Sequence, residues 1–385
     1  MRVAIVAEYY PRAADPVLGV WAHRQALAAR AAGADVRVLV LHRPVPSKGA
    51  LRAREPWALI EPLRQPLHTT LDGIEVTYVP FVAPPRPRSY GSWGAWAAPS
   101  LALALRRVGP IDLIHAHYAA PAGDAVRRAR PRAPVVISVH GGDVLSVVHR
   151  THGRAAVTRA LGHARLVLAN SKGTEQRAQA LGAMHTRVVH LGTDLPPAPA
   201  TEPRLPTIAT VGHLVARKRH SDLLRALWLL RDSHPDLRWV VAGDGPERAG
   251  LERLVSELKL GGRVTLRGQV PPAEAVTTAQ SATVFALPSV DEAFGVAYIE
   301  AMAAGVPAIG CRGEAGPEEI AATGPGLRLV PPGDPEALAA ELRKLLDDAE
   351  WRRELGHGAR ATVERAFTWE ACGRATVEAY EEALG

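Results

Sequence analysis

Residues 288–310 read PSVDEAFGVAYIEAMAAGVPAIG and directly follow an apolar run, TVFAL, at 283–287. The apolar run predicts a buried strand, and the small residues after it predict a helix that opens near Gly295 and carries Glu300. Two acidic residues, Asp291 and Glu292, lie in the loop between the strand and the helix. In an open α/β sheet, ligands bind beyond the carboxyl ends of the strands, where helix N-termini present free N–H groups to anions. The stretch therefore predicts an anion-binding site, with phosphate as the first candidate.

The two glutamates have seven residues between them, and Ala-Met-Ala-Ala-Gly-Val-Pro follows the second. This pattern resembles the hallmark of the retaining glycosyltransferases of family 4, which have the two-domain GT-B fold. The resemblance implies that Glu292 contacts the transferred sugar, that Glu300 binds the ribose hydroxyls of the nucleotide, and that backbone amides between them hold the diphosphate. The residues that it assigns to the donor in this way are Phe294, Gly295, Val296 and Ala297. Acids also stabilise a helix start through its dipole, and this plain structural role is the alternative.

The length of 385 residues suggests two domains, and the order of the apolar runs supports this. In the first half, strand-like runs alternate with helical stretches such as 22–32 and 156–162, which is typical of a parallel, doubly wound sheet. These runs lie at 3–7, 36–41, 113–115, 135–139 and 166–169. After a proline-rich stretch the alternation returns, with runs at 207–211, 239–242, 264–266, 283–287 and 307–309. We therefore expect an α/β protein of the GT-B class, with two Rossmann-like domains that face a central cleft.

These patterns divide the chain into four segments. We expect an acceptor-side Rossmann-like domain at 1–195, a proline-rich linker at 196–206, and a nucleotide-sugar-binding domain at 207–366. Residues 367–385 are expected to form a C-terminal helix, which the resemblance implies crosses back to the N-terminal domain. The alternative is a plain terminal helix of the second domain.

The formal net charge is +7, but the two halves differ strongly. Residues 1–200 carry 25 Lys and Arg against 12 Asp and Glu, whereas residues 201–385 carry 21 against 27. A basic half joined to an acidic half indicates that the first meets an anionic surface or acceptor. No helix-turn-helix, zinc or RNA-recognition motif accompanies the charge, so we expect no nucleic acid partner.

The chain is expected to be cytoplasmic. Its first apolar run is too short for a signal peptide, and no window reaches the roughly 18 apolar residues of a membrane span. Two cysteines in different elements offer neither a disulfide framework nor a thiolate metal site. Aromatic residues such as Trp57, Trp93 and Trp96 interleave with arginines between 57 and 107. We therefore expect a peripheral contact of the basic domain with the anionic inner face of the plasma membrane, or an acceptor-side surface on which a polymer stacks; the alternative is that these tryptophans pack on their own domain.

Three loops of the first half resemble family 4 loops that face the donor or the acceptor. Gly19 precedes an amphipathic helix and matches the glycine loop whose amides lie against the donor diphosphate. His140, in Val-His-Gly-Gly-Asp, matches the histidine beside the transferred hexose, and His117, Tyr118 and Asp143 would look toward the acceptor. Together these loops look most like the subgroup that contains teichuronic-acid-type envelope polysaccharide transferases. A loop glycine and hydrogen-bonded strand-end histidines without a ligand are the alternatives.

The first strand of the second half runs into Gly-His-Leu-Val-Ala-Arg-Lys. Family members have Arg where His213 stands and Lys where Lys218 stands, and both cations contact the diphosphate. His213 departs from this pattern, so charge stabilisation would rest on Lys218 with Arg217. A later loop with Gly243 and Gly245 matches a segment beside the nucleobase, although a simple βα turn explains these glycines equally well.

The resemblance implies a hexosyltransferase of class EC 2.4 that retains anomeric configuration by front-face attack. Its expected catalytic residues are His140, Lys218 and Glu292. As the nucleoside diphosphate leaves, charge moves onto the β-phosphate, where cations and oriented amides can stabilise it without a metal. No Asp-x-Asp sequence occurs, so we expect no metal and no cofactor besides the nucleoside-diphosphate sugar substrate.

The expected reaction moves a hexose-type sugar to a glycan or lipid-linked acceptor in envelope polysaccharide or glycolipid synthesis. Three alternatives remain on the same fold. A nonhydrolysing nucleotide-sugar epimerase would need no acceptor, a sugar phosphorylase would need a pyridoxal-phosphate lysine, and a non-catalytic nucleotide-sugar-binding regulator would bind donor without turnover.

Overall fold

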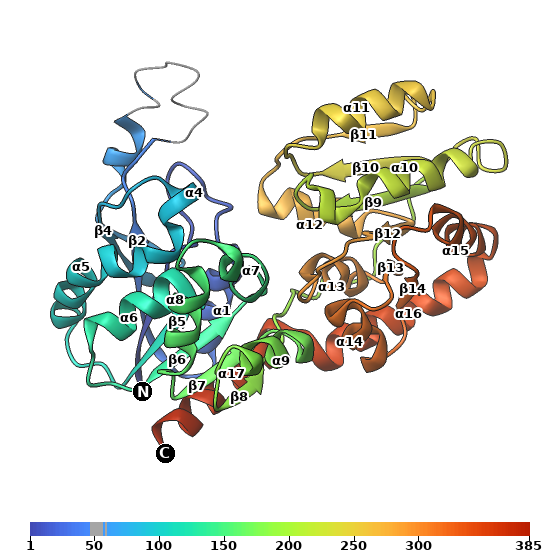
Figure 1. Cartoon of the computed structure of the whole chain (residues 1–385). Coiled ribbons are helices and arrows are strands. Elements are labelled where there is room, and N and C mark those ends of the chain that lie inside the picture. The colour runs from blue at the N-terminus through green and yellow to red at the C-terminus, as the bar shows by residue number, and fades with distance from the viewer. Residues whose placement is uncertain (47–56, 58–59) are drawn as a thin grey trace. The chain divides into compact units, whose positions relative to one another are not determined.

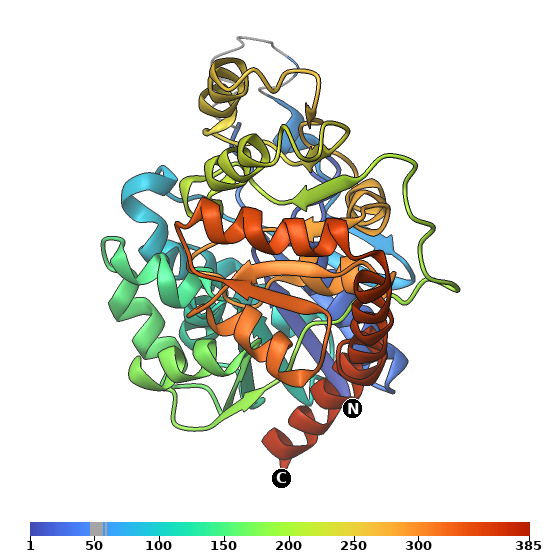
Figure 2. The ribbon, with the colours of Figure 1, turned by 90° about the vertical axis from the view of Figure 1, so that its right-hand side faces the viewer.

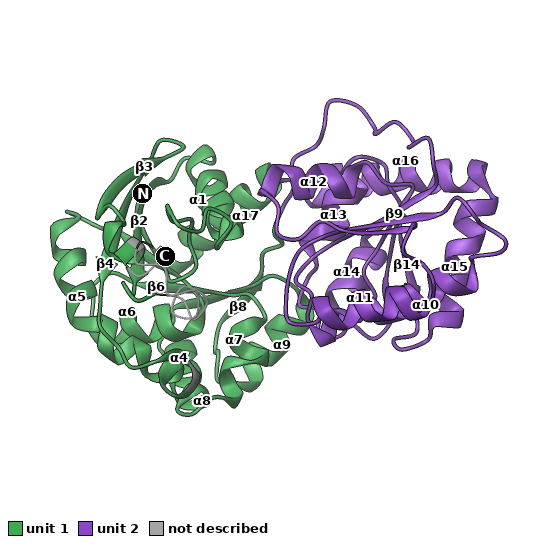
Figure 3. Cartoon of the chain, turned by 90° about the horizontal axis from the view of Figure 1, so that it is seen from above, with its two compact units in different colours: residues 1–191, 369–385 green, residues 192–368 purple. Residues whose placement is uncertain are grey.

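The computed structural model divides the chain into two compact units (Figures 1 and 3). The first unit comprises residues 1–191 and 369–385, and the second comprises residues 192–368. The last helix therefore belongs to the first unit, although the whole second unit precedes it in the sequence. None of the helices that the structure describes is long and apolar enough to cross a membrane. The described residues are 1–46, 57 and 60–385.

The first unit is built on an eight-stranded sheet in the order β3-β4-β2-β1-β5-β6-β7-β8. All neighbouring strands run parallel except β3, which is antiparallel to β4 at one edge. Its strands are β1 (Arg2–Ala7), β2 (Asp35–His42), β3 (His68–Leu71), β4 (Ile74–Pro80), β5 (Leu113–His117), β6 (Val135–Val139), β7 (Leu166–Ala169) and β8 (Thr186–Val188). The sequence predicted β1, β2, β5, β6 and β7 but not the edge strands or β4.

Helices cover both faces of this sheet. They are α1 (Val20–Ala31), α4 (Arg86–Ser89), α5 (Trp93–Arg107), α6 (Asp124–Ala129), α7 (Gly142–Leu145), α8 (Gly153–Leu161), α9 (Lys172–Ala180) and α17 (Trp369–Leu384), with short turns η1 (Glu61–Arg64), η2 (Tyr90–Ser92), η3 (Ala119–Gly123) and η4 (Val147–His149). In the central strand β1, Val3 and Ile5 pack in the core under α1 and α17, whereas Ala4 and Val6 pack in the core under α5, α6 and α8. Because both faces are buried, the parallel strands read as apolar runs.

The stretch 57–107 shows little periodicity in the sequence, yet it folds into η1, the β3–β4 hairpin, α4, η2 and α5. Residues 58–59 of this stretch lie outside the described part. Trp93 is 5% exposed and packs in the domain core, as the alternative interpretation required. Trp57 and Trp96 are instead 69% and 51% exposed.

The second unit has a six-stranded, wholly parallel sheet in the order β11-β10-β9-β12-β13-β14. Its strands are β9 (Thr207–Val211), β10 (Arg238–Ala242), β11 (Val264–Leu266), β12 (Val284–Ala286), β13 (Ala308–Cys311) and β14 (Leu327–Val330). Only β14 was not predicted. Residues 196–206 form neither helix nor strand, as the prolines predict.

The helices of this unit are η5 (Ala216–Lys218), α10 (His220–Leu229), α11 (Arg248–Glu257), α12 (Pro272–Gln280), α13 (Val296–Ala303), α14 (Ala315–Thr323), α15 (Pro335–Asp347) and α16 (Ala349–Ala366). Leucines of α10, α11 and α15 pack on one face of the sheet, against Ile208, Val241 and Val284. Figure 2 turns the last strands and helices of this unit toward the viewer.

Helix α17 packs closely against α1 in the first unit. A Cβ atom at Gly373 would lie 2.3 Å from the backbone oxygen of Ala28, so only glycine lets the helices approach this far. Next to this contact, Gln25 Nε2 donates a hydrogen bond of 3.1 Å to Thr376 Oγ1. The helix thus completes one of the two cores of the first sheet.

Replacing Gly373 by alanine should destabilise the first unit, against the usual sign for glycine in a helix. Alanine normally favours a helix by about 1 kcal/mol over glycine. At this position the new Cβ would collide with the backbone of α1, so we expect a net loss of about 1–3 kcal/mol in the free energy of unfolding, measured by urea denaturation. The matched control is Gly250 in α11, where a Cβ would meet only the end of the Arg253 side chain, at 3.9 Å. Gly250→Ala should raise stability, and a rise for Gly373→Ala would contradict the close helix contact.

Candidate active site

The candidate site residues of the second unit lie beyond the carboxyl ends of β9 and β12. β9 and β12 are neighbours in the sheet. From β9 the chain continues to β10 on one side, and from β12 it continues to β13 on the other side, so the strand order reverses between β9 and β12. A crevice for ligands forms at such a reversal of strand order. The loop after β9 ends in η5, and the loop after β12 leads into α13. The two loops touch, because the Val290 amide donates a hydrogen bond of 2.8 Å to the Arg217 carbonyl.

Lys218 and Glu292 form a buried ion pair that joins these two loops. The Lys218 ammonium donates to Glu292 Oε2, and the Ser289 hydroxyl donates to the same oxygen over 2.7 Å. The guanidinium of the half-exposed Arg217 lies 3.9 Å from it. Burial alone would raise the pKa of Glu292, but Lys218, Arg217 and Ser289 outweigh burial and hold the pKa below its ordinary value. Glu292 is therefore a carboxylate at neutral pH.

Glycine is required where α13 begins. Gly295 has a φ of 91°, and a Cβ there would lie 2.4 Å from the ring of Tyr298. Tyr298 is fully buried and donates a hydrogen bond of 2.5 Å to the Leu287 carbonyl, which fixes the ring in place. The N-cap residue Gly295 has no side chain, so no N-cap side chain competes with a ligand for the amides of Val296 and Ala297. This helix start suits an anion.

Phe294 and Glu300, the other two residues expected to bind the nucleotide-sugar donor, lie before and after the helix start. Phe294 is 1% exposed and packs on Phe367, so only its backbone can meet a ligand. Glu300 lies further along α13 and is partly buried. Burial and the nearby charge of Asp194 raise the pKa of Glu300 to about 7. Since this pKa is raised in the folded state, ionisation of Glu300 opposes folding as the pH rises toward 7.

The loop after β9 is packed by backbone rather than by side chains. A Cβ at Gly243 would lie 1.9 Å from the Gly212 carbonyl oxygen, and one at Gly245 would lie 2.3 Å from that of Leu214. Close backbone packing therefore explains these two glycines, independently of any contact with the nucleobase. His213, between the two contact points, is exposed.

In the first unit, the strand order reverses between β1 and β5, so the corresponding crevice lies beyond these strands. Gly19 immediately precedes α1 and has a φ of 68°. A Cβ there would lie 2.2 Å from the carbonyl of Tyr9, which follows β1. Glycine thus lets the start of α1 lie directly against the end of the central strand. The contact of its amide with a diphosphate stays a prediction.

His140, beyond β6, is the end of a row of three histidines. Its ring lies nearly parallel to that of His117, with His117 Nδ1 3.0 Å from His140 Nε2. The ring centre of His115 lies 4.4 Å from that of His117, and the nitrogens of His115 lie 2.8 Å from Tyr380 OH and 2.7 Å from Ser138 Oγ. Burial lowers the pKa of His140 and of His115 to about 3, and that of His117 well below its ordinary value. The row is therefore neutral at physiological pH.

The tautomers of His117 and His140 are coupled, because the two rings share one hydrogen-bonding proton. Their other nitrogens, His117 Nε2 and His140 Nδ1, are buried without a hydrogen-bond partner in the described part of the chain. In either arrangement one of them is a donor and the other an acceptor. Unpaired buried groups of this kind suit a hydroxyl group or water. His117 is only 1% exposed, so the structure places it behind His140 rather than in the open position expected for an acceptor contact.

Asp143 also differs from the expected acceptor contact. It is fully buried, and its carboxylate accepts hydrogen bonds from the amides of Ala119, over 3.0 Å, and His140, over 3.1 Å. Burial raises the pKa of Asp143 to about 6 although these amides oppose the rise. Asp143 thus holds the loops after β5 and β6 together. Tyr118 keeps partial exposure, with its ring 5.4 Å from that of His140 and 5.0 Å from that of Tyr9, and its acceptor role stays a prediction.

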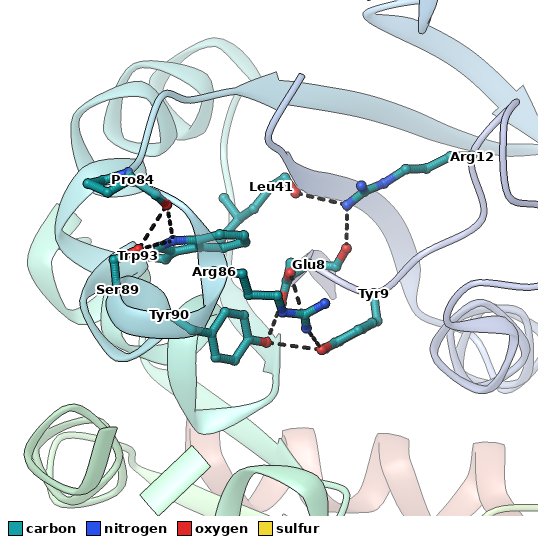
Figure 4. A network of polar contacts seen from close by, with 9 residues as sticks. All are labelled: Glu8, Tyr9, Arg12, Leu41, Pro84, Arg86, Ser89, Tyr90 and Trp93. Carbon is teal, nitrogen blue, oxygen red and sulfur yellow. Dashed lines mark hydrogen bonds and ion pairs between the residues drawn. The ribbon is translucent and has the colours of Figure 1, made fainter. Parts of the chain in front are cut away.

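Sequence reasoning missed a polar network beside these loops (Figure 4). Glu8 directly follows β1 and is buried, and the hydroxyl of Tyr90 donates to it over 2.5 Å. Arg86 lies 3.8 Å from the Glu8 carboxylate and donates to the hydroxyl of Tyr9. Burial raises the pKa of Glu8, and Arg86 and Tyr90 offset part of that rise. An acid at the end of an apolar strand was the available signal; its partner Tyr90 is 82 residues away, and no spacing pointed to it.

Comparison with known proteins bears on both units. A model described as Glycosyltransferase Family 4 matches residues 18–196, and one described as Glycosyl transferases group 1 matches residues 194–362. A D-inositol 3-phosphate glycosyltransferase from Nocardioides sp. is 30% identical in an alignment of 405 positions, gaps included, that covers 92% of this chain and 86% of that protein. The chain belongs to the family 4 glycosyltransferases.

A further relative and two solved structures resemble the chain over nearly their full length. A protein described as the teichuronic acid biosynthesis glycosyltransferase TuaC of Bacillus subtilis (strain 168) is 28% identical over 95% of both chains. The structure of sucrose-phosphate synthase from Thermosynechococcus elongatus has a TM-score of 0.77 at 22% identity, over 99% of this chain and 98% of that one. Anabaena HepE, in complex with UDP, has a TM-score of 0.73 at 20% identity, over 99% and 100%. The predicted family, GT-B fold and enzyme class are thus confirmed, whereas the roles of single residues stay predictions.

Replacing Lys218 by methionine should reverse the pH dependence that Glu292 gives to stability. In the wild type the folded-state pKa of Glu292 is below its ordinary value of 4.5, so its contribution is present above that pH and is lost as the pH falls. Without Lys218, burial dominates and the pKa rises, so the variant should gain stability as the pH falls. At neutral pH we expect a loss of about 3–5 kcal/mol in the free energy of unfolding, because a buried charge is left uncompensated.

The measurement is thermal unfolding between pH 4 and pH 8. Arg217→Met is the matched control, because Arg217 is half exposed and lies further from the carboxylate. That variant should lose less than about 1 kcal/mol. Parallel pH profiles for Lys218→Met and the wild type would show that the ion pair is not buried in solution.

Proposed function

We propose that the chain is a retaining, metal-independent hexosyltransferase. It moves a hexose-type sugar from a nucleoside-diphosphate sugar to a glycan or lipid-linked acceptor, in envelope polysaccharide or glycolipid synthesis. The observation that carries the proposal is the buried Lys218–Glu292 pair beside the uncapped start of α13, at the strand-order reversal of the second unit. The pair and the helix start together offer what a diphosphate and a neighbouring hydroxyl need: oriented amides, cations and a fixed acceptor oxygen.

The second unit supplies the donor site in this proposal. The amides of Gly295, Val296 and Ala297 hold the diphosphate, and Arg217 with Lys218 stabilises the charge that develops on the β-phosphate as the bond to the sugar breaks. Arg217 is available because its side chain is half exposed. The absence of an Asp-x-Asp sequence supports a reaction without a metal.

Retention by front-face attack is supported by the state of Glu292. A double displacement would need a carboxylate free to bond the anomeric carbon. One Glu292 oxygen already accepts hydrogen bonds from both Lys218 and Ser289, so this oxygen is not free to attack the anomeric carbon. Glu292 is better placed to accept a hydroxyl of the sugar. The departing phosphate then takes the proton of the acceptor hydroxyl.

The first unit supplies the hexose and acceptor side. His140 Nδ1, buried and unpaired among the described residues, can bond a hydroxyl of the transferred hexose. Because burial keeps the imidazole neutral, it orients the sugar without adding positive charge next to an oxocarbenium-like centre. Gly19 brings the start of α1 to the same edge of the sheet.

We further propose that the enzyme works in the cytoplasm and contacts the membrane peripherally. Helix α5 exposes Trp96 and Leu103 together with Arg106 and Arg107. An apolar side chain set beside arginines suits the headgroup layer of an anionic membrane.

The decisive experiment combines binding with turnover. Each of a panel of UDP-, GDP-, ADP- and TDP-sugars is tested for thermal stabilisation of the chain, and each stabilising donor is offered to lipid-linked and free glycan acceptors with and without EDTA. We expect one donor class to raise the melting temperature and to give a product whose anomeric configuration, read by NMR, matches the donor. Conversion of the donor without any acceptor would point to the epimerase, and binding without turnover would point to the regulator.

Glu300 should make donor binding depend on pH. Ribose hydroxyls donate to the ionised carboxylate, and such charged hydrogen bonds contribute about 1.5–3 kcal/mol. With a pKa of about 7 in the free protein, Glu300 is mostly protonated at pH 6 and mostly ionised at pH 8. Affinity for the stabilising nucleotide, measured by calorimetry, should therefore rise roughly tenfold over this range in the wild type relative to Glu300→Gln. Titration of the nucleotide itself cancels in this ratio; identical profiles would remove Glu300 from the site.

A further inference from the structure

The polar network at the end of β1 carries more positive than negative charge. Glu8 is its buried carboxylate, and Arg12 and Arg86 both lie around it. The guanidinium carbons of Arg86 and Arg150 lie 4.5 Å and 5.5 Å from the centre of one ring, that of Tyr90. Within the described residues, Arg150 has no carboxylate at ion-pair distance. Two cations therefore stack on one ring with a single carboxylate beside them.

Both arginines are accessible. The side chain of Arg86 is 45% exposed although its partner Glu8 is buried, and Arg150 is exposed. Stacking fixes each guanidinium in position, and the N–H groups of Arg86 that do not face Tyr9 and Glu8, like those of the exposed Arg150, can bond a ligand. Glu8 and the hydroxyl of Tyr9 hold Arg86 from behind, as Figure 4 shows.

A row of rings leads from these arginines to His140. The Arg86 guanidinium lies 5.4 Å from the ring centre of Tyr9, which lies 5.0 Å from that of Tyr118, which in turn lies 5.4 Å from that of His140. Aromatic faces of this kind stack on the apolar faces of sugar rings. An acceptor whose reacting hydroxyl meets the hexose at His140 would therefore pass along Tyr118 and Tyr9 and end at the two arginines.

We propose that Arg86 and Arg150 form a subsite for an anionic group of the acceptor, a carboxylate or a phosphate, on the sugar residues next to the one that is glycosylated. The inference rests on the proposed function for the position of the hexose at His140. Guanidinium groups match carboxylate and phosphate oxygens in a two-point geometry, whereas a neutral hydroxyl would leave their charge uncompensated. The enzyme would then select acidic acceptors over neutral ones through Arg86 and Arg150, and Glu8 would act as a positioning residue for Arg86.

The test measures thermal stabilisation of the full chain with glucuronate, glucose 6-phosphate, inorganic phosphate and glucose, each with and without the nucleotide that binds best. We expect glucuronate and glucose 6-phosphate to stabilise the wild type and glucose to have no effect. Arg150→Gln and Arg86→Gln should each weaken the two anionic sugars by roughly tenfold or more, the loss expected for a charged hydrogen bond. Because Arg86 also compensates buried Glu8, Arg150→Gln is the variant that leaves the fold least disturbed.

Arg88→Gln is the matched control, because Arg88 is an exposed arginine of the same short helix α4 as Arg86. It should leave the response to every probe unchanged, and all three variants should keep the shift caused by the nucleotide. Absence of any nucleotide shift in the wild type would reject the proposed function, while the anion arms without nucleotide still report on the subsite.

Three results would overturn the inference. The first is equal stabilisation by glucose and by the anionic sugars. The second is an anion effect that survives both arginine substitutions, or that inorganic phosphate alone reproduces in full. The third is loss of binding to phosphatidylglycerol vesicles in Arg86→Gln and Arg150→Gln with no effect of the anionic sugars, which would assign the arginines to a lipid headgroup.

Discussion

The buried ion pair between Lys218 and Glu292 is the interaction on which the site of the second unit depends. It ties the loops after β9 and β12 together where the strand order reverses, and Ser289 fixes the orientation of the carboxylate. Because the two charges compensate each other, the pair adds little net charge to the crevice. The positive field for a diphosphate then comes from the half-exposed Arg217 and the amides of α13. Lys218 adds to it to the extent that its ammonium is shared between Glu292 and the diphosphate.

The first unit follows a different electrostatic logic. Burial keeps His115, His117 and His140 neutral, so a row of imidazoles can orient hydroxyl groups without charge. Positive charge is concentrated instead around Glu8, at the end of the neighbouring strand. One edge of one sheet thus presents a neutral end and a cationic end, joined by aromatic rings. This separation fits a substrate whose reacting sugar and charged group lie some distance apart.

Much of the architecture was predictable because parallel strands buried on both faces read as apolar runs, and because the spacing of Glu292 and Glu300 is recognisable. The β3–β4 hairpin was missed because β3 has only four residues and because polar residues interrupt the apolar ones in both strands, although Asp72-Gly73 is a characteristic two-residue turn. The positions of the site residues depend on burial, which sequence patterns do not reveal. His117 and Asp143 look like rim residues in the sequence, but hydrogen bonds to His140 and to loop amides draw them inside.

The membership of α17 in the first unit has a consequence for biosynthesis. The ribosome releases the whole second unit before α17, so one core of the first sheet remains open until then. During that interval His115 lacks its hydrogen-bond partner Tyr380, and Ala28 of α1 lacks the helix that packs against it. Nascent chains would expose this apolar surface longest, which makes it a natural target for chaperones and a point where truncated products would aggregate.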